Sequence, residues 1–165
     1  MAQLTPKERL QPSLLDRLVA PRPEQRGAPL AISVDVLRES VRRELAALFS
    51  AASLVTVDQE LESRTQLRRS TVNFGMAVLS GRTASSVNLA QLERQLARAI
   101  REFEPRLSPS SLKVRSVGEA GSKNHNTLCF EIEGDLWAQP LPQKLLLRTE
   151  LDLESGQVRV QESSC

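Results

Sequence analysis

The sequence has no tyrosine, one tryptophan and four phenylalanines among its 165 residues. Proteins that bind single-stranded nucleic acid stack bases on aromatic side chains, and many recognition surfaces use tyrosine and tryptophan as anchors. So few aromatic residues argue against both classes of binding protein. We therefore expect recognition through backbone, aliphatic and arginine contacts.

Cysteine and histidine are also scarce. The chain has two cysteines, Cys129 and Cys165, and one histidine, His125. Isolated cysteines make neither a disulfide framework nor a zinc site, so we expect a buried Cys129 and a solvated His125 rather than a nucleophile pair. The seven glycines do not cluster in a phosphate-binding motif. No catalytic residue, metal or cofactor is expected.

Long apolar stretches are missing as well. A membrane-spanning helix needs about 20 apolar residues, and charged residues interrupt every run of the sequence, including the first twenty positions. The net charge of +2 is too small to indicate a nucleic-acid binder. These observations favour a soluble, cytoplasmic protein without a cleaved signal.

The N-terminal segment has a composition of its own. The short amphipathic stretch Leu14–Leu18 is followed by three prolines and a glycine within residues 21–29, which exclude a helix or a central strand there. We predict an N-terminal arm and Pro-rich linker over residues 1–30 and a single α+β domain over residues 31–165. The arm either orders in a partner's groove or packs on its own domain as a small helix.

Two helices are predicted from apolar residues that recur at steps of three and four. The first has Ser33 as its N-cap and the apolar stripe Val34, Leu37, Val41, Leu45 and Leu48. The second begins after Asn88, ends before Pro105 and has the stripe Leu89, Leu92, Leu96, Ile100 and Phe103. Between them, residues 54–57 are predicted as a short strand or the last turn of the first helix, and residues 68–81 as an ordered loop.

The period changes to two after Pro109, as in β-strands. Strands are predicted over residues 112–117, 128–136, 145–153 and 157–160. The glycine of Glu154-Ser155-Gly156 favours a tight hairpin between the last two. Helices followed by strands indicate an α+β fold, with two main helices packed on one face of a small antiparallel sheet of about four strands.

One constellation stands out at the end of the second helix. Proline fixes the backbone of Glu104-Pro105-Arg106, so Glu104 and Arg106 are expected to project from a rigid helix exit. A partner-binding site is one interpretation of this pattern. The alternative is a local arrangement in which Arg106 meets the last carbonyls of the helix and Glu104 meets a basic neighbour.

The order of these segments resembles a known family. The chain has Leu14-Leu15-Asp16-Arg17-Leu18, then Arg69-Ser70-Thr71-Val72-Asn73-Phe74-Gly75, then Ile100–Leu107 with its Glu-Pro-Arg motif, then a β-rich tail. This succession resembles TssE, the baseplate subunit family of type VI secretion systems, which is related to wedge proteins of contractile-tailed phages. The Glu-Pro-Arg motif is its most specific part.

The resemblance implies a structural subunit that links the baseplate wedge to the first ring of the contractile sheath. It implies partner contacts at Glu104, Pro105 and Arg106, at Leu14, Leu15, Asp16, Arg17 and Leu18, and at Asn73, Phe74 and Gly75. The implied partners are the wedge subunits TssF, TssG and TssK and the sheath subunits TssB and TssC, with no nucleic acid and no membrane insertion. The implied location is the cytoplasm, in a baseplate docked at the inner membrane.

Two other functions stay open at this point. A regulatory module of the anti-adaptor type would use the same surfaces on a soluble partner. A peptidoglycan hydrolase is the third, because the family has carried a lysozyme-like label. Glycoside hydrolysis usually needs two carboxylates flanking the bond, and Arg106 beside Glu104 favours the charged form of that acid, which is the wrong form for a general acid.

Overall fold

The structure is a computed structural model that describes residues 13–19, 33–83, 86–117, 126–138 and 141–163. Its α-helices are α1 (Leu14–Val19), α2 (Val34–Ser50), α3 (Leu54–Val57), α4 (Thr65–Arg68) and α5 (Leu89–Phe103). Two 3-10 turns, Gln59–Ser63 and Thr71–Asn73, lie between them. The strands are β1 (Lys113–Val117), β2 (Thr127–Leu136), β3 (Gln143–Asp152) and β4 (Val158–Glu162).

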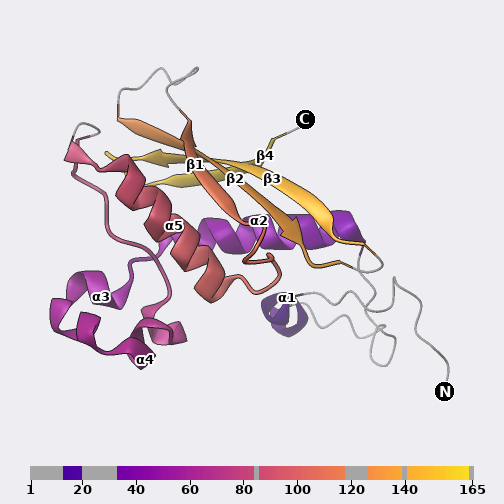
Figure 1. The fold of residues 1–165 in the computed structure, drawn as a ribbon, viewed down its shortest axis with the longest axis horizontal. Coiled ribbons are helices and arrows are strands. Elements are labelled where there is room, and N and C mark those ends of the chain that lie inside the picture. The colour runs from indigo at the N-terminus through magenta and orange to yellow at the C-terminus, as the bar shows by residue number, and fades with distance from the viewer. Residues whose placement is uncertain (1–12, 20–32, 84–85, 118–125, 139–140, 164–165) are drawn as a thin grey trace.

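The four strands form one antiparallel sheet in the order β1-β2-β3-β4, so each strand pairs with its neighbour in sequence (Figure 1). The β2–β3 pair is the longest, running from Thr127 opposite Asp152 to Leu136 opposite Gln143. Alternate residues of β3 from Leu145 to Leu151 are buried, as the period of two predicts. All four predicted strands are confirmed to within two residues at each end.

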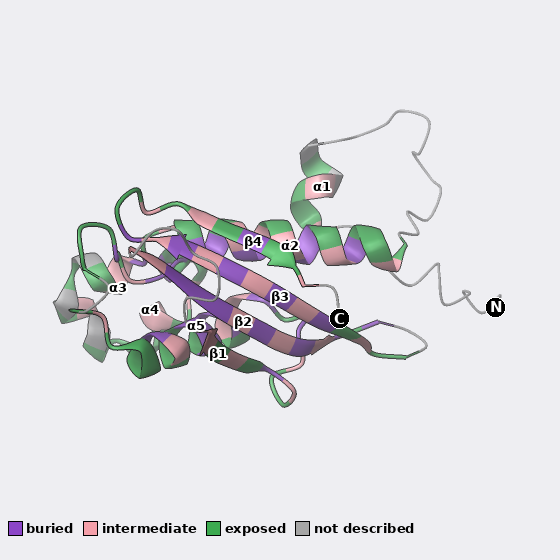
Figure 2. Ribbon diagram, turned by 90° about the horizontal axis from the view of Figure 1, so that it is seen from above, coloured by how far each residue is buried: buried purple, intermediate pink, exposed green. Residues whose placement is uncertain are grey.

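Both long helices lie against the same face of the sheet. Helix α2 contacts β4 and α5 contacts β1, so the two helices cover the two edge strands, and they also contact one another. Figure 2 looks down onto the sheet, with the helices behind the strands and buried residues alternating along β2 and β3. The predicted α+β fold with two main helices on one face is therefore confirmed.

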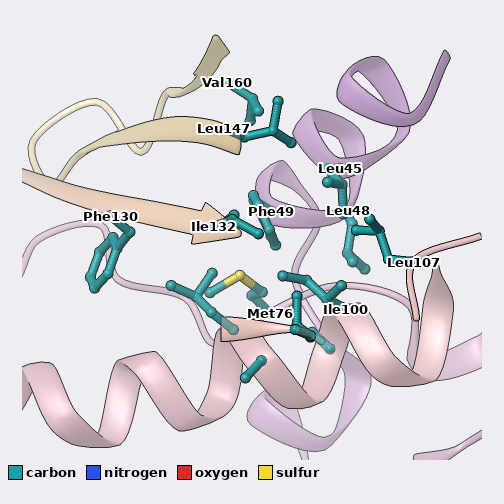
Figure 3. Close-up of a cluster of buried hydrophobic side chains, with 14 of the residues drawn as sticks. Leu45, Leu48, Phe49, Met76, Ile100, Leu107, Phe130, Ile132, Leu147 and Val160 are labelled. Atoms are coloured by element: carbon teal, nitrogen blue, oxygen red, sulfur yellow. The ribbon is translucent and has the colours of Figure 1, made fainter. Parts of the chain in front are cut away.

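The hydrophobic core fills the space between these layers (Figure 3). It joins side chains from α2, α5 and three strands, among them Leu45, Leu48, Ile100, Phe130, Ile132, Leu147 and Val160, each at most 2% exposed. Burying a large aliphatic or aromatic side chain contributes about 1.5 to 3 kcal/mol to folding. Packing between the layers is therefore the main source of stability.

Both long helices begin where the sequence predicts, and α5 also ends there. The Ser33 hydroxyl accepts a hydrogen bond from the Val36 amide (3.3 Å), and the Asn88 side chain accepts one from the Gln91 amide (3.0 Å). Helix α5 ends at Phe103 because Pro105 excludes the helical conformation at Glu104, whose φ and ψ are −120° and 81°. The predicted caps are confirmed.

The segment between the long helices differs from its prediction. Residues 54–57 are neither a strand nor the last turn of α2, because the chain becomes extended at Ala51 and α3 then begins separately. A short parallel bridge causes this break: Met76 donates to the Ala51 carbonyl (2.8 Å) and accepts from the Ser53 amide (2.9 Å). Residues 68–81 form an ordered loop, as predicted, although it contains the 3-10 turn Thr71–Asn73.

The N-terminal arm is described only in part. Leu14–Val19 form α1, whereas residues 1–12 and 20–32 lie outside the described residues, so the division at residue 30 stays a prediction. Within the described part of the chain, no helix is both long and apolar enough to cross a lipid bilayer.

Candidate protein interface

The Glu104-Pro105-Arg106 turn forms a compact ion pair. Arg106 Nε donates to Glu104 Oε1 (2.7 Å) and Arg106 Nη2 donates to Glu104 Oε2 (2.5 Å). The guanidinium therefore binds the carboxylate through two parallel hydrogen bonds. The Arg106 amide also donates to Glu104 Oε1 (3.1 Å). Glu104 is 3% exposed, and this geometry satisfies both of its oxygens from within the chain.

The same guanidinium reaches across to α2. Arg106 Nη1 donates to the Ser40 hydroxyl (3.1 Å) and Nη2 donates to Glu44 Oε2 (2.5 Å). Burial works against the charge of Arg106, but its hydrogen bonds and attraction to Glu104 and then Glu44 outweigh it and raise its pKa above the ordinary value. Arg106 therefore ties the exit of α5 to α2 as a permanent cation.

Neighbouring backbone contacts hold the turn on the sheet. The Arg106 carbonyl accepts a hydrogen bond from the Trp137 amide (2.7 Å), and Leu107 bridges Leu136 at the end of β2. Trp137 itself is 59% exposed and Pro105 is exposed. The exposed surface around the turn therefore consists of Pro105, Trp137 and the partly exposed side chain of Arg106.

This arrangement corrects one geometric expectation. Glu104 does not project outward from the helix exit but is buried against Arg106, because the guanidinium needs its carboxylate to lie inside the turn. Arg106 meets the side chains of Glu104, Ser40 and Glu44 rather than the last carbonyls of α5. The contact of this turn with a partner stays a prediction, now restricted to its exposed part.

Asn73, Phe74 and Gly75 take three different positions. Asn73 is buried, where its side chain accepts from the Val55 amide (3.0 Å) and donates to the Arg68 carbonyl (3.0 Å). It therefore fastens α3 and α4 to the loop. Phe74 is 38% exposed and packs edge-on against Phe103, with ring centroids 5.5 Å apart.

Gly75 is required by a close backbone approach. Its φ is +127°, and a Cβ atom placed there would lie 2.5 Å from the Ala51 carbonyl oxygen. Both conditions exclude other residues without a backbone shift. Asn73 and Gly75 are thus frame residues in this structure, and of the three only Phe74 has a substantially exposed side chain.

Helix α1 presents the opposite arrangement. Leu14, Leu15 and Leu18 are 69%, 58% and 69% exposed. Asp16 accepts two hydrogen bonds from Arg43 of α2 (2.7 and 2.8 Å), and these bonds lower the pKa of Asp16 despite a small opposing effect of burial. The Arg17 side chain lies outside the described residues. The Asp16–Arg43 ion pair therefore attaches α1 to α2, while its leucines are exposed.

Sequence reasoning missed the partners of Arg106. Ser40 falls within the apolar spacing of α2, three residues after Leu37, and is 3% exposed, so a polar residue at a core position was the available signal. Glu44 lies one turn further on and binds Ser40 (3.3 Å). Trp137, the single tryptophan, was also overlooked at the end of β2.

The nucleophilic and metal-ligating side chains of the described residues do not form a second candidate site. Cys129 is a buried free thiol, as expected, whereas His125 and Cys165 lie outside the described residues. No group of three metal-ligating side chains is found in the part of the chain that the structure describes.

Comparison with known proteins identifies the family. A profile of the baseplate wedge protein gp25 matches residues 35–141, which is more than half of the chain. The match includes α2 except its first residue, α5, β1, β2 and the Glu104-Pro105-Arg106 turn. Neither a curated protein nor a solved structure shows significant similarity. The match supports the structural role of a baseplate component and agrees with the resemblance drawn from the motifs: the chain belongs to the baseplate wedge protein gp25 family.

Proposed function

We propose that this chain is a non-enzymatic baseplate subunit of a type VI secretion system that links the wedge to the first ring of the contractile sheath. The observation that carries the proposal is the match to the baseplate wedge family over residues 35–141. The order of the Leu14–Leu18, Asn73–Gly75 and Glu104–Arg106 motifs supports the secretion-system branch. In the assembled state, the subunit would lie in a cytoplasmic baseplate docked at the inner membrane.

The geometry around Glu104 supports a structural role over hydrolysis. Glu104 and Glu44 both bind Nη2 of Arg106, so the two carboxylates come close enough to suggest a glycosidase pair. The guanidinium, however, occupies the space between them, and Glu104 is 3% exposed. A sugar bond has no access to that space unless the ion pair opens.

A zymogram on peptidoglycan tests this part of the proposal. The purified chain and its Glu104→Gln variant are both expected to show no cleavage. Turnover above background in the wild type that disappears in Glu104→Gln would overturn the non-enzymatic assignment.

The sheet edges are the proposed attachment points for a sheath strand. Along β4, Gln157 and Ser163 bond to β3, so by alternation Val158, Val160 and Glu162 turn their N–H and C=O groups to the open side. The Val160 carbonyl accepts from Arg42 (2.8 Å), whereas no described residue bonds to the outward amides, that of Glu162 among them. Unpaired edge groups accept an added strand with little side-chain demand.

At the opposite edge, one of the outward amides is already occupied. The Ser116 amide of β1 donates to Glu93 of α5 (2.6 Å). The pKa of Glu93 is lowered first by a hydrogen bond with the Ser116 side chain and then by this amide. Both edge strands are five residues long, but by the same alternation β1 turns only Val114 and Ser116 outward, whereas β4 turns three residues outward. We therefore assign the sheath-facing edge to β4.

Proline substitutions at the two edges test whether a sheath strand attaches to β4 or to β1. Glu162→Pro removes an outward amide without touching the β3–β4 bonds and is expected to abolish fluorescent sheaths in cells, whereas Ser116→Pro is expected to keep them. Glu162→Ala and Ser116→Ala are the matched controls, because they lose the same side chains and keep the amides. Sheath loss in Ser116→Pro alone would move the attachment to β1, and unchanged sheaths in both would exclude edge pairing.

Wedge contacts are proposed at the exposed leucines of α1 and at the outer part of the Glu104-Pro105-Arg106 turn. A pull-down from cells at native expression tests the partners. Co-purification of TssF, TssG, TssK and the sheath subunits TssB and TssC is the expected result. Recovery of one soluble regulator instead would favour the anti-adaptor alternative.

A further inference from the structure

An open groove of about 490 Å³ lies between α5 and the segment that runs from α3 through the loop Gly75–Leu79. One wall is the polar side of α5, with Gln91 and Gln95, and the other includes Val55 and Val78. The groove is separate from the Glu104-Pro105-Arg106 turn and from the β4 edge. Figure 1 shows α3 and α4, with the chain that joins them, next to α5.

The groove has a positive charge. Its ionisable lining residues are Arg68, Arg82, Arg98 and Glu102. Arg98 is paired with Glu102 (3.1 Å), whereas neither Arg68 nor Arg82 forms an ion pair with a described residue. Two guanidiniums are therefore available to carboxylates from outside the chain, and guanidinium binds carboxylate with strong, directional hydrogen bonds.

The backbone of Ala77 and Val78 places a second requirement on whatever occupies the groove. Met76 bonds through both its amide and its carbonyl to the segment around Ala52. In a parallel pairing the next residue turns its backbone groups the other way, so Ala77 directs its N–H and C=O away from Ala52. No described residue bonds to the backbone of Ala77 or Val78, and both line the groove. An extended peptide finds hydrogen-bonding partners there.

Apolar surface completes the site. The Val78 side chain is 50% exposed at the groove, and Val55 is half-buried beside it. An occupant that fits all three features has an extended backbone, carboxylates that reach Arg68 and Arg82, and small aliphatic side chains between them. An alternation of acidic and β-branched residues meets these requirements.

We propose that this groove binds an extended acidic segment of a partner protein, which lies along Ala77–Val78 with its carboxylates on Arg68 and Arg82. The site goes beyond the proposed baseplate function and does not depend on it. Single-stranded nucleic acid fits less well, because the lining of the groove contains one aromatic residue, Phe103, and its ring already packs against Phe74.

Fluorescence anisotropy on the purified full chain tests the proposal. The probe is a labelled peptide of alternating glutamate and valine with blocked ends. It is expected to bind in low salt and to weaken as salt rises, since the attraction is screened. The same peptide with glutamine for glutamate, and the glutamate peptide with N-methylated backbone amides, are each expected to bind about tenfold more weakly.

Charge reversal locates the site. Arg68→Glu and Arg82→Glu are each expected to weaken peptide binding by about tenfold or more. Arg64→Glu is the matched control, because Arg64 is exposed on the same segment but does not line the groove; the expected change is less than about twofold. Arg82 is an exposed loop residue, so its variant keeps the test valid if Arg68→Glu fails to fold, as judged by circular dichroism.

Three outcomes would overturn the proposal. The first is equal binding of the glutamate and glutamine peptides. The second is an effect of Arg64→Glu as large as that of Arg82→Glu, which would indicate a general charge effect. The third is a single-stranded DNA oligonucleotide that binds more tightly than the acidic peptide. None of these results requires baseplate or sheath subunits, so they leave the proposed function to its own tests.

Discussion

The Glu104-Pro105-Arg106 turn and helix α1 were predicted to serve the same purpose, yet they are built in opposite ways. The turn directs its carboxylate inward, where Arg106 joins α5 to Ser40 and Glu44 of α2. Helix α1 directs its leucines outward and is held by one ion pair. The difference teaches that the more specific motif can hold the frame together, while the less specific one carries the exposed apolar surface.

Arg106→Ala is expected to have the largest effect on stability. It leaves the Glu104 carboxylate buried without its partner, which typically lowers the free energy of unfolding by about 3 to 5 kcal/mol. Urea denaturation measures the loss, with Arg101→Ala as an exposed control on the same helix. A loss below about 1 kcal/mol, the value of an exposed pair, would remove the contrast between the turn and α1.

Gly75→Ala tests whether the loop behind α3 belongs to the frame as well. A side chain at φ +127° strains the backbone and also meets the Ala51 carbonyl, so the expected loss is about 2 to 4 kcal/mol. Gly81→Ala is a useful comparison, because its φ is also positive (+81°) but nothing lies within 4 Å of the added Cβ. Equal losses at the two positions would show that the close approach at Gly75 is unimportant.

The leucines of α1 are expected to affect assembly more than stability. The variant changes Leu14, Leu15 and Leu18 together to serine. Because all three side chains are exposed, each of the three substitutions should change the free energy of unfolding by less than about 0.5 kcal/mol. We expect fewer fluorescent sheaths in cells that carry this variant. Val72→Ser, at an exposed apolar side chain of the Thr71–Asn73 turn, is the control. A large drop in melting temperature would show that α1 packs on its own domain.

Acid is expected to produce the smallest effect, confined to α1. The Arg43 hydrogen bond holds the pKa of Asp16 below its ordinary 3.8, so the pair stabilises the docked helix fully above that value and is lost as the pH falls through the lowered pKa. Amide chemical shifts of residues 13–18 followed between pH 6 and the acid range report the release. Arg43→Gln should show the released shifts at every pH; shifts that still move with the wild-type midpoint would contradict the assignment.

The sequence was sufficient to predict the elements with a regular period. The stripes of α2 and α5 and the alternation in β2 and β3 repeat over enough residues to identify them and to indicate the core face. Ser33 and Asn88 then indicated where the two helices begin, and Pro105 indicated where α5 ends. Each of these features depends on residues that are close together in the sequence, so the sequence pattern alone was sufficient to predict them.

Contacts between residues that are far apart in the sequence could not be predicted from these patterns. Arg106 lies 66 residues from Ser40 and 62 from Glu44, and no periodicity links such positions. The turns between Leu54 and Asn73 are each too short for a period and are held by Asn73 and the Ala52–Met76 bridge. For the same reason the sequence pointed to Glu104 correctly as a special residue but gave the wrong direction for its side chain.

The order of the strands has a consequence for how the chain folds during synthesis. Each strand pairs with the one before it, so the sheet can grow by successive hairpins, which are fast local events. Helix α2 is made early but packs on β4: Arg38 binds Glu162, 124 residues later, and Arg42 binds the Val160 carbonyl, 118 residues later. Its apolar face must therefore wait until the last strand leaves the ribosome. In a nascent chain stalled before Val158, we expect rapid hydrogen exchange throughout α2, and protection there would show that α5 alone can hold it.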